Sequence, residues 1–162
     1  MIVIGIDPGI SNTGYGVVER RGGRLLALDG GVISTHPDTD LALRVAAIAD
    51  RIDALVHEHK PDAMAIESIY FGRNVQTAFA VGHARGAILA VAGRHLLETS
   101  SYTPQQIKQA VCGSGRADKL QVQRMVAALL ELAGELPADH AADALAAGIC
   151  HVNMAPLAKA LA

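Results

Sequence analysis

Short apolar segments alternate with longer amphipathic ones along the chain, and this pattern predicts an α/β fold. Three β-rich runs open the sequence at residues 2–6, 15–18 and 32–34, separated by the glycine-rich and arginine-rich turns of an antiparallel meander. Two further apolar runs, at 63–66 and 96–99, each follow a helical segment. Strands that alternate with helices favour a parallel arrangement. We therefore expect a mixed β-sheet, with three antiparallel strands followed by parallel strands, flanked by helices.

Helical periodicity predicts five helices between and after these strands. Asp40 is the predicted N-cap of the first helix, and Thr103 begins a capping box with proline at the first helical position. The predicted helices run from residue 41 to the stop at Lys60-Pro61, from 74 to 93, from 104 to about 112, from 119 to 132 and from 139 to about 152.

The helix predicted at 74–93 is apolar nearly all round, and small residues recur on it at every fourth position. They are Ala78, Gly82, Gly86 and Ala90. Such a stripe lets another helix approach closely. It suits either a central core helix or a contact with a second subunit, and the sequence leaves both open.

Composition predicts a cytoplasmic globular domain. The 162 residues, 51% of them hydrophobic, suffice for one core, so we expect 1–162 to form a single domain. Cys112 and Cys150 lack disulfide or zinc spacing. No secretory leader opens the sequence and no apolar run reaches about 18 residues, so we expect no membrane association. The net charge of −2 means that any nucleic-acid site must depend on local clusters of Lys and Arg.

Acidic residues stand at the ends of two predicted strands. Asp7 follows the first apolar run, and Glu67 follows the fourth. A lone acid after a strand is often a turn former, but the predicted last helix adds His140 and Asp143, three apart on one face. Buried unpaired carboxylates are costly, and a divalent cation removes that cost. Ligand sets of this kind hold Mg²⁺ or Mn²⁺ and favour phosphoryl chemistry, so these residues predict a metal-dependent phosphate enzyme.

Five motifs resemble, in their order and spacing, those of the RuvC-type Holliday-junction resolvases over nearly the whole chain. They are GIDPGISNTGYGVV, AIESIYFGRN, GHARGAI, QIKQAVCGSGRADKLQVQ and ADHAADALA. The resemblance implies an RNase H-like nuclease domain, a homodimer, a four-way DNA junction as substrate and a branch-migration motor as partner. It also implies paired symmetric nicks with 5′-phosphate and 3′-hydroxyl ends, about two Mg²⁺ or Mn²⁺ ions per subunit, and a role in DNA recombination and repair.

Position by position, the resemblance implies that Asp7, Glu67 and Asp143 are catalytic carboxylates and metal ligands. His140 occupies the remaining position, where many family members have aspartate. Histidine suits Mn²⁺ and loses its ligand lone pair as pH falls, so acid should reduce activity. Asp139 also shares a face with Asp143 and is the alternative ligand, which would leave His140 as a supporting residue or a proton acceptor for water. We favour His140 because it keeps the three-residue spacing of the family.

The resemblance also implies a DNA-binding set around these acids. Lys108 and Lys119 match family positions that bind DNA close to the cut, and Arg116 and Arg73 are basic neighbours. Tyr70 holds the position of the stacking aromatic of the family. An aromatic ring there can stack on an unpaired base at the crossover.

Other functions stay open from the sequence. GIDPGISNTG is also similar to the first phosphate loop of actin-like ATPases and sugar kinases, which enclose a nucleotide between two such lobes. A non-catalytic junction-binding module, with its metal site impaired by His140, is a second alternative. An RNase H-like nuclease acting on RNA is the nearest alternative among enzymes. Gly9 and Gly14 permit either a tight turn or a close backbone approach, and an ordinary hairpin explains them equally well.

Overall fold

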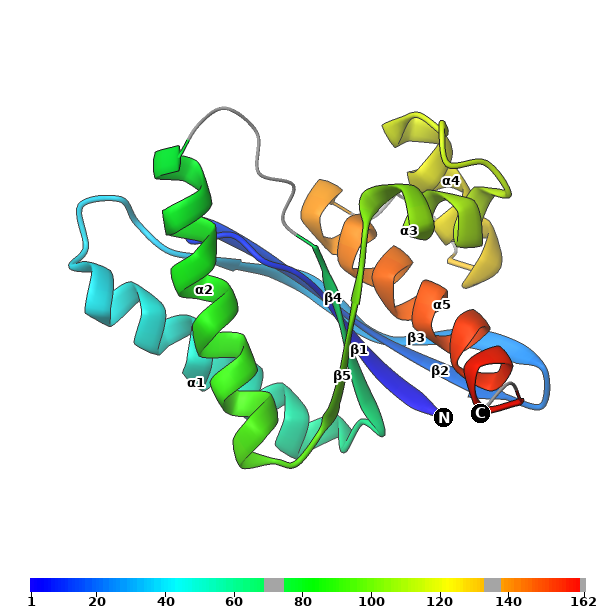
Figure 1. The fold of residues 1–162 in the computed structure, drawn as a ribbon, viewed down its shortest axis with the longest axis horizontal. Coiled ribbons are helices and arrows are strands. Elements are labelled where there is room, and N and C mark those ends of the chain that lie inside the picture. The colour runs from blue at the N-terminus through cyan, green and yellow to red at the C-terminus, as the bar shows by residue number, and fades with distance from the viewer. Residues whose placement is uncertain (69–74, 133–137, 161–162) are drawn as a thin grey trace.

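The sheet is the centre of the molecule (Figure 1). The structure is a computed structural model that describes residues 1–68, 75–132 and 138–160. Within these residues, five strands form one sheet in the order β3-β2-β1-β4-β5. Strands β1 (Ile2–Asp7), β2 (Asn12–Arg21) and β3 (Arg24–Ser34) are antiparallel, whereas β4 (Ala63–Glu67) and β5 (Glu98–Tyr102) are parallel to β1. The predicted mixed sheet is confirmed.

Helices cover both faces of this sheet (Figure 1). Helices α1 (Leu41–His59) and α2 (Val75–Arg94) lie together on one face. Helices α3 (Pro104–Cys112), α4 (Lys119–Leu129) and α5 (Asp139–Ala160) lie on the other. No helix in the described part of the chain has the length and apolar composition needed to cross a membrane.

Strand β1 is apolar up to its last residue, Asp7, because it contributes to a hydrophobic core on each face. Val3 belongs to the core that α3, α4 and α5 help to form, and its neighbour Ile4 belongs to the core that α1 and α2 help to form. Successive side chains of a strand point to opposite faces, so a central strand covered on both sides has no polar alternation. The run MIVIGI is therefore a central strand rather than an edge.

Two predicted helix starts are confirmed by their hydrogen bonds. The Asp40 Oδ1 accepts from the backbone N–H of Ala42 at 2.8 Å. The Thr103 side chain accepts from the backbone N–H of Gln106, whose own side chain accepts from the Thr103 N–H at 2.8 Å. These caps satisfy backbone donors that have no partner within the helix.

The strand predicted at 96–99 lies further along the chain, at Glu98–Tyr102. Leu96 is 92% exposed and has a φ of 53°, which no strand residue adopts. Its N–H bonds to the Gly93 carbonyl at 3.2 Å, so it belongs to the turn that ends α2. Two helix ends also differ from expectation, because α4 ends at Leu129 and α5 continues to Ala160.

Helix α5 lies directly on the backbone of the central strands because these strands carry glycines at the contact. A Cβ added at Gly5 would overlap the Ala144 carbonyl oxygen, and one at Gly14 would overlap that of His140. Gly14 therefore does not serve the turn between β1 and β2; it lies within β2 and permits close approach of α5.

Candidate active site

Asp7 and Glu67 lie side by side at the C-terminal ends of β1 and β4, because these two strands are parallel neighbours. Ile6 is in register with Ile66, and both side chains belong to the core under α1 and α2. The next residue of each strand points to the opposite face, toward α5. Adjacent strands are about 4.8 Å apart, so the register itself brings these two carboxylates together.

The first turns of α5 add two further side chains next to these strand ends. Asp7 is paired with Gly14 across β1 and β2, and His140 lies over that glycine. The His140 Nδ1 is 2.7 Å from the Asp7 Oδ2. Asp143 follows on the same face of α5 and lines a small pocket together with Glu67. The structure thus brings together the four side chains that were predicted as catalytic and metal-binding.

Crowding of these acids changes their proton affinity. Burial, followed by the nearby charges of Asp7 and Asp143, raises the pKa of Glu67 to about 8, although Lys108 opposes the rise. Burial, followed by the charge of Asp7, also raises the pKa of Asp143. A raised pKa of this kind means that the positive charges nearby do not offset the burial and mutual repulsion of the carboxylates.

The chemical types of these donors suit a divalent cation. Three carboxylates provide the oxygen ligands that Mg²⁺ and Mn²⁺ prefer, and the His140 imidazole adds a nitrogen donor that Mn²⁺ accepts more readily. The positive charge would offset the desolvation and repulsion that raise the pKa of Glu67. The residues that would hold the ion are therefore Asp7, Glu67, His140 and Asp143.

We expect the stability of the metal-free protein to fall as pH rises from about 4.5 to 8. In this window the folded state holds a proton on Glu67 that the unfolded state has released, so raising the pH favours unfolding. Relative to Glu67→Gln, the wild type should lose on the order of 3 kcal/mol across the window. Urea denaturation in a chelator at several pH values measures the difference. Parallel pH profiles for the two proteins would contradict the assignment.

Asp139, the alternative ligand, is engaged with α4 instead of with the acids. Its Oδ2 lies 2.8 Å from the Lys119 Nζ, and its Oδ1 accepts from the Gln123 Nε2 at 2.7 Å. These contacts lower the pKa of Asp139, chiefly through the hydrogen bond from Lys119. Of the two candidates, only His140 contacts Asp7, and this contact favours His140.

The predicted DNA-binding residues have different surroundings. Lys108 lines the same small pocket as Glu67. Lys119 is held at the start of α5 by its ion pair with Asp139. Arg116 borders an open depression beside α3. Tyr70 and Arg73 lie outside the described residues.

One residue near the acids was not predicted. Arg85 of α2 donates from Nη1 to the Glu67 carbonyl oxygen at 3.3 Å and from Nη2 to the Ser101 Oγ at 2.7 Å. It therefore fastens α2 to the ends of β4 and β5, where Glu67 is located. The signal in the sequence was a single arginine within the apolar run GHARGAI.

Comparison with known proteins identifies the family of this chain. The family model described as Crossover junction endodeoxyribonuclease RuvC matches residues 3–151. The chain belongs to this RuvC family. The RuvC of Moorella thermoacetica is 47% identical over 156 residues, which cover 96% of this chain and 93% of the relative. That of Alkaliphilus oremlandii is 45% identical over 94% of this chain and 93% of the relative.

Solved RuvC structures share the fold. The structure of Thermus thermophilus RuvC superposes with a TM-score of 0.89 at 38% identity, covering 98% of this chain and 97% of that one. The same protein in complex with a Holliday junction substrate gives a TM-score of 0.93, covering 98% of this chain and 96% of that one. The predicted RNase H-like fold is thereby confirmed, and membership of an endodeoxyribonuclease family disfavours the nucleotide-binding lobe and the non-catalytic module.

Proposed function

We propose that this chain is an endonuclease that resolves four-way DNA junctions by hydrolysing phosphodiester bonds in paired symmetric nicks, in DNA recombination and repair. The observation that carries the proposal is the convergence of four side chains at the C-terminal ends of β1 and β4. They are Asp7, Glu67, His140 and Asp143. Membership of the RuvC family supports it, as does similarity to a RuvC bound to a junction. Residues 1–162 would act as one nuclease domain.

The four site residues would have two roles, which are binding a cation and accepting or donating protons. Asp7, Glu67, Asp143 and His140 would hold Mg²⁺ or Mn²⁺, about two ions per subunit, and the bound metal supplies Lewis acidity and a water of lowered pKa. The Asp7 carboxylate accepts a hydrogen bond from the His140 Nδ1–H, which leaves the Nε2 of a neutral ring without a proton. His140 can therefore act as a ligand or accept a proton at Nε2.

A four-way junction of known sequence tests the proposal directly. We expect Mg²⁺ or Mn²⁺ to produce two symmetric nicks whose 5′-phosphate and 3′-hydroxyl ends a ligase can seal, with little cutting of linear duplex. A denaturing gel resolves the products. Preferred cutting of structured RNA would favour the RNA nuclease. Tight ATP binding without cleavage would favour the nucleotide-binding lobe, and junction binding without cleavage in either metal would favour the non-catalytic module.

Lys108→Gln should weaken junction binding by about tenfold, irrespective of sequence, because the lysine lies beside the acids where a scissile phosphate must approach. The slope of log affinity against log salt should flatten by about one. Fluorescence anisotropy at several salt concentrations measures both effects. The control is Lys60→Gln, because Lys60 is exposed at the far end of α1. Equal effects of the two substitutions would show that Lys108 contributes only general charge.

The exposed face of α2 supports the proposed homodimer. Gly82 and Gly86 have open space where a Cβ would lie, whereas Ala84 and Ile88 on the other face are fully buried. Phe79, on the same helix, is 68% exposed. An isologous dimer through this face would match the two-fold symmetry of a junction and place two equal sites on opposed strands.

Gly86→Arg should convert the dimer to a monomer that makes unpaired nicks, because a long charged side chain cannot enter a close helix contact. Sedimentation measures the mass, and a supercoiled cruciform substrate distinguishes paired from single cuts. Leu43→Arg on α1, where Leu43 is 63% exposed, is the matched control. If the Gly86→Arg protein stays dimeric, the dimer interface does not lie on this face of α2. The branch-migration motor and the cytoplasmic location stay predictions.

A further inference from the structure

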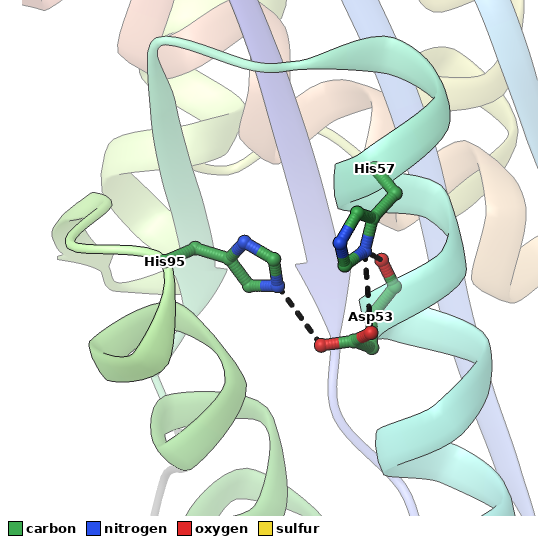
Figure 2. A group of neighbouring side chains, drawn as sticks. All are labelled: Asp53, His57 and His95. Carbon is green, nitrogen blue, oxygen red and sulfur yellow. Dashed lines mark hydrogen bonds and ion pairs between the residues drawn. The ribbon is translucent and has the colours of Figure 1, made fainter.

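A second cluster of ligand-type side chains lies at the other end of the sheet from Glu67. Asp53 and His57 are four residues apart on α1 and therefore share a face, and His95 comes from the turn that follows α2. Figure 2 shows both imidazole rings directed toward the Asp53 carboxylate. The His95 Nε2 lies 2.9 Å from the Asp53 Oδ1, and the His57 Nδ1 lies 3.2 Å from its Oδ2.

The spacing of these donor atoms suits one metal ion. One donor atom from each residue lies within 4.8 Å of the other two. A tetrahedral ion with bonds of about 2.0–2.1 Å places neighbouring ligand atoms roughly 3.3 Å apart. The two contacts of the imidazoles with Asp53, at 2.9 and 3.2 Å, are close to that value but involve different carboxylate oxygens. Metal binding would require rotation of the side chains and loss of any proton from the ligating ring nitrogens.

We propose that Asp53, His57 and His95 form a second, structural metal site for a transition ion such as Zn²⁺, Co²⁺ or Ni²⁺, which fastens α1 to the end of α2. Two imidazoles and one carboxylate favour these ions over Mg²⁺, which prefers oxygen ligands alone. The hydrogen bond from His95 lowers the pKa of Asp53, so the carboxylate stays ionised as a ligand must. His57 is exposed, which gives an ion access from solvent and leaves room for water as a further ligand.

This site is separate from the nuclease chemistry. Helices α1 and α2 lead into β4 and β5, so their last turns lie where these strands begin, whereas Glu67 lies where β4 ends. No residue is shared between the two clusters. Binding there would stabilise the fold by linkage, without any part in cleavage.

Arg94 gives the proposal a distinctive signature. Its Nη2 lies 3.6 Å from the Asp53 Oδ1, where its charge competes with a cation for the same carboxylate. The Arg94 side chain is largely exposed and can turn away when an ion binds. Removing this arginine should therefore strengthen metal binding, whereas in a network held only by hydrogen bonds it would have no such effect.

The test uses untagged, chelator-stripped protein carrying Asp7→Asn and His140→Ala, so that the active site offers fewer donors for the added metal. Zn²⁺ alone is titrated by calorimetry and by thermal denaturation. We expect about one ion per chain and a raised Tm, whereas Mg²⁺ should have no effect. Adding His57→Gln or Asp53→Asn should weaken Zn²⁺ affinity roughly tenfold or more, and adding Arg94→Gln should strengthen it. His36→Gln, at an exposed histidine beside Asp38, is the control.

His57→Gln is the decisive variant, because an exposed side chain on α1 can be replaced without disturbing the core. The visible absorption of bound Co²⁺ reports its ligands independently of stability and should change on this substitution but not on His36→Gln. Zn²⁺ affinity and Co²⁺ absorption that are both unaffected by His57→Gln would overturn the proposal. Because no cleavage is measured, either result leaves the nuclease assignment untouched.

Discussion

Glu67→Gln is expected to abolish junction cleavage, with a loss of at least about 10²-fold in rate, while junction binding is retained. Glutamine keeps the size of the side chain but could not supply a negative charge to a cation that Asp7, Glu67 and Asp143 would hold. Binding depends mainly on basic residues and should be retained. Single-turnover cleavage and anisotropy, measured on the same junction, separate the two effects.

The matched control is Glu98→Gln, which removes an exposed carboxylate at the start of β5, away from the strand ends that carry Asp7 and Glu67. It should cut at the wild-type rate. Cleavage by Glu67→Gln at that same rate would remove Glu67 from the catalytic set and with it the proposed site. Loss of both binding and cleavage would instead indicate a folding defect, which circular dichroism would reveal.

The two strand-end acids could be predicted because their positions depend on local pattern and simple sheet geometry. An apolar run followed by an acid marks the end of a buried strand, and the C-terminal ends of parallel neighbouring strands lie side by side. Ile6 and Ile66 occupy the core side, which places Asp7 and Glu67 together on the other face. The alternation of side chains decides this orientation without any further information.

Helical geometry alone could not choose between His140 and Asp139; only the three-residue spacing of the family favoured His140. Residues three and four apart both share a helical face, so either could accompany Asp143. The structure distinguishes them through a contact between helices, because Lys119 and Gln123 of α4 engage Asp139. Such contacts depend on how α4 packs against α5, which no local pattern contains.

Long-range pairings were also beyond the sequence. His95 meets Asp53 across 42 residues, and Arg85 reaches the carbonyl of Glu67 across 18. The misplaced start of β5 has a more local cause, because the Leu96-Leu97 pair is apolar enough for a strand but lies in the turn that closes α2. Hydrophobicity alone does not separate a strand residue from an apolar residue in a helix-ending turn.

Gly14→Ala should have the second largest effect, although it changes no functional group. Its Cβ would overlap the His140 carbonyl oxygen, which belongs to a helix backbone and cannot rotate away as a flexible side chain would. Helix α5 must therefore move from the sheet, at an expected cost of about 3 kcal/mol in stability. The same movement displaces His140 from Asp7, and a shift of about 1 Å in a catalytic group can lower the rate by about 10²-fold.

Gly30→Ala is the control that isolates this overlap. The nearest atom to a Cβ at Gly30 lies 3.6 Å away, an ordinary contact, so its stability should change by less than about 0.5 kcal/mol. Urea denaturation and single-turnover cleavage should separate the two variants in parallel, because one displacement causes both losses. A stable Gly14→Ala protein with normal cleavage would mean that α5 tolerates the shift and that the His140 contact with Asp7 does not set the rate. A destabilised protein with normal cleavage would separate the packing role of Gly14 from the chemistry that α5 carries.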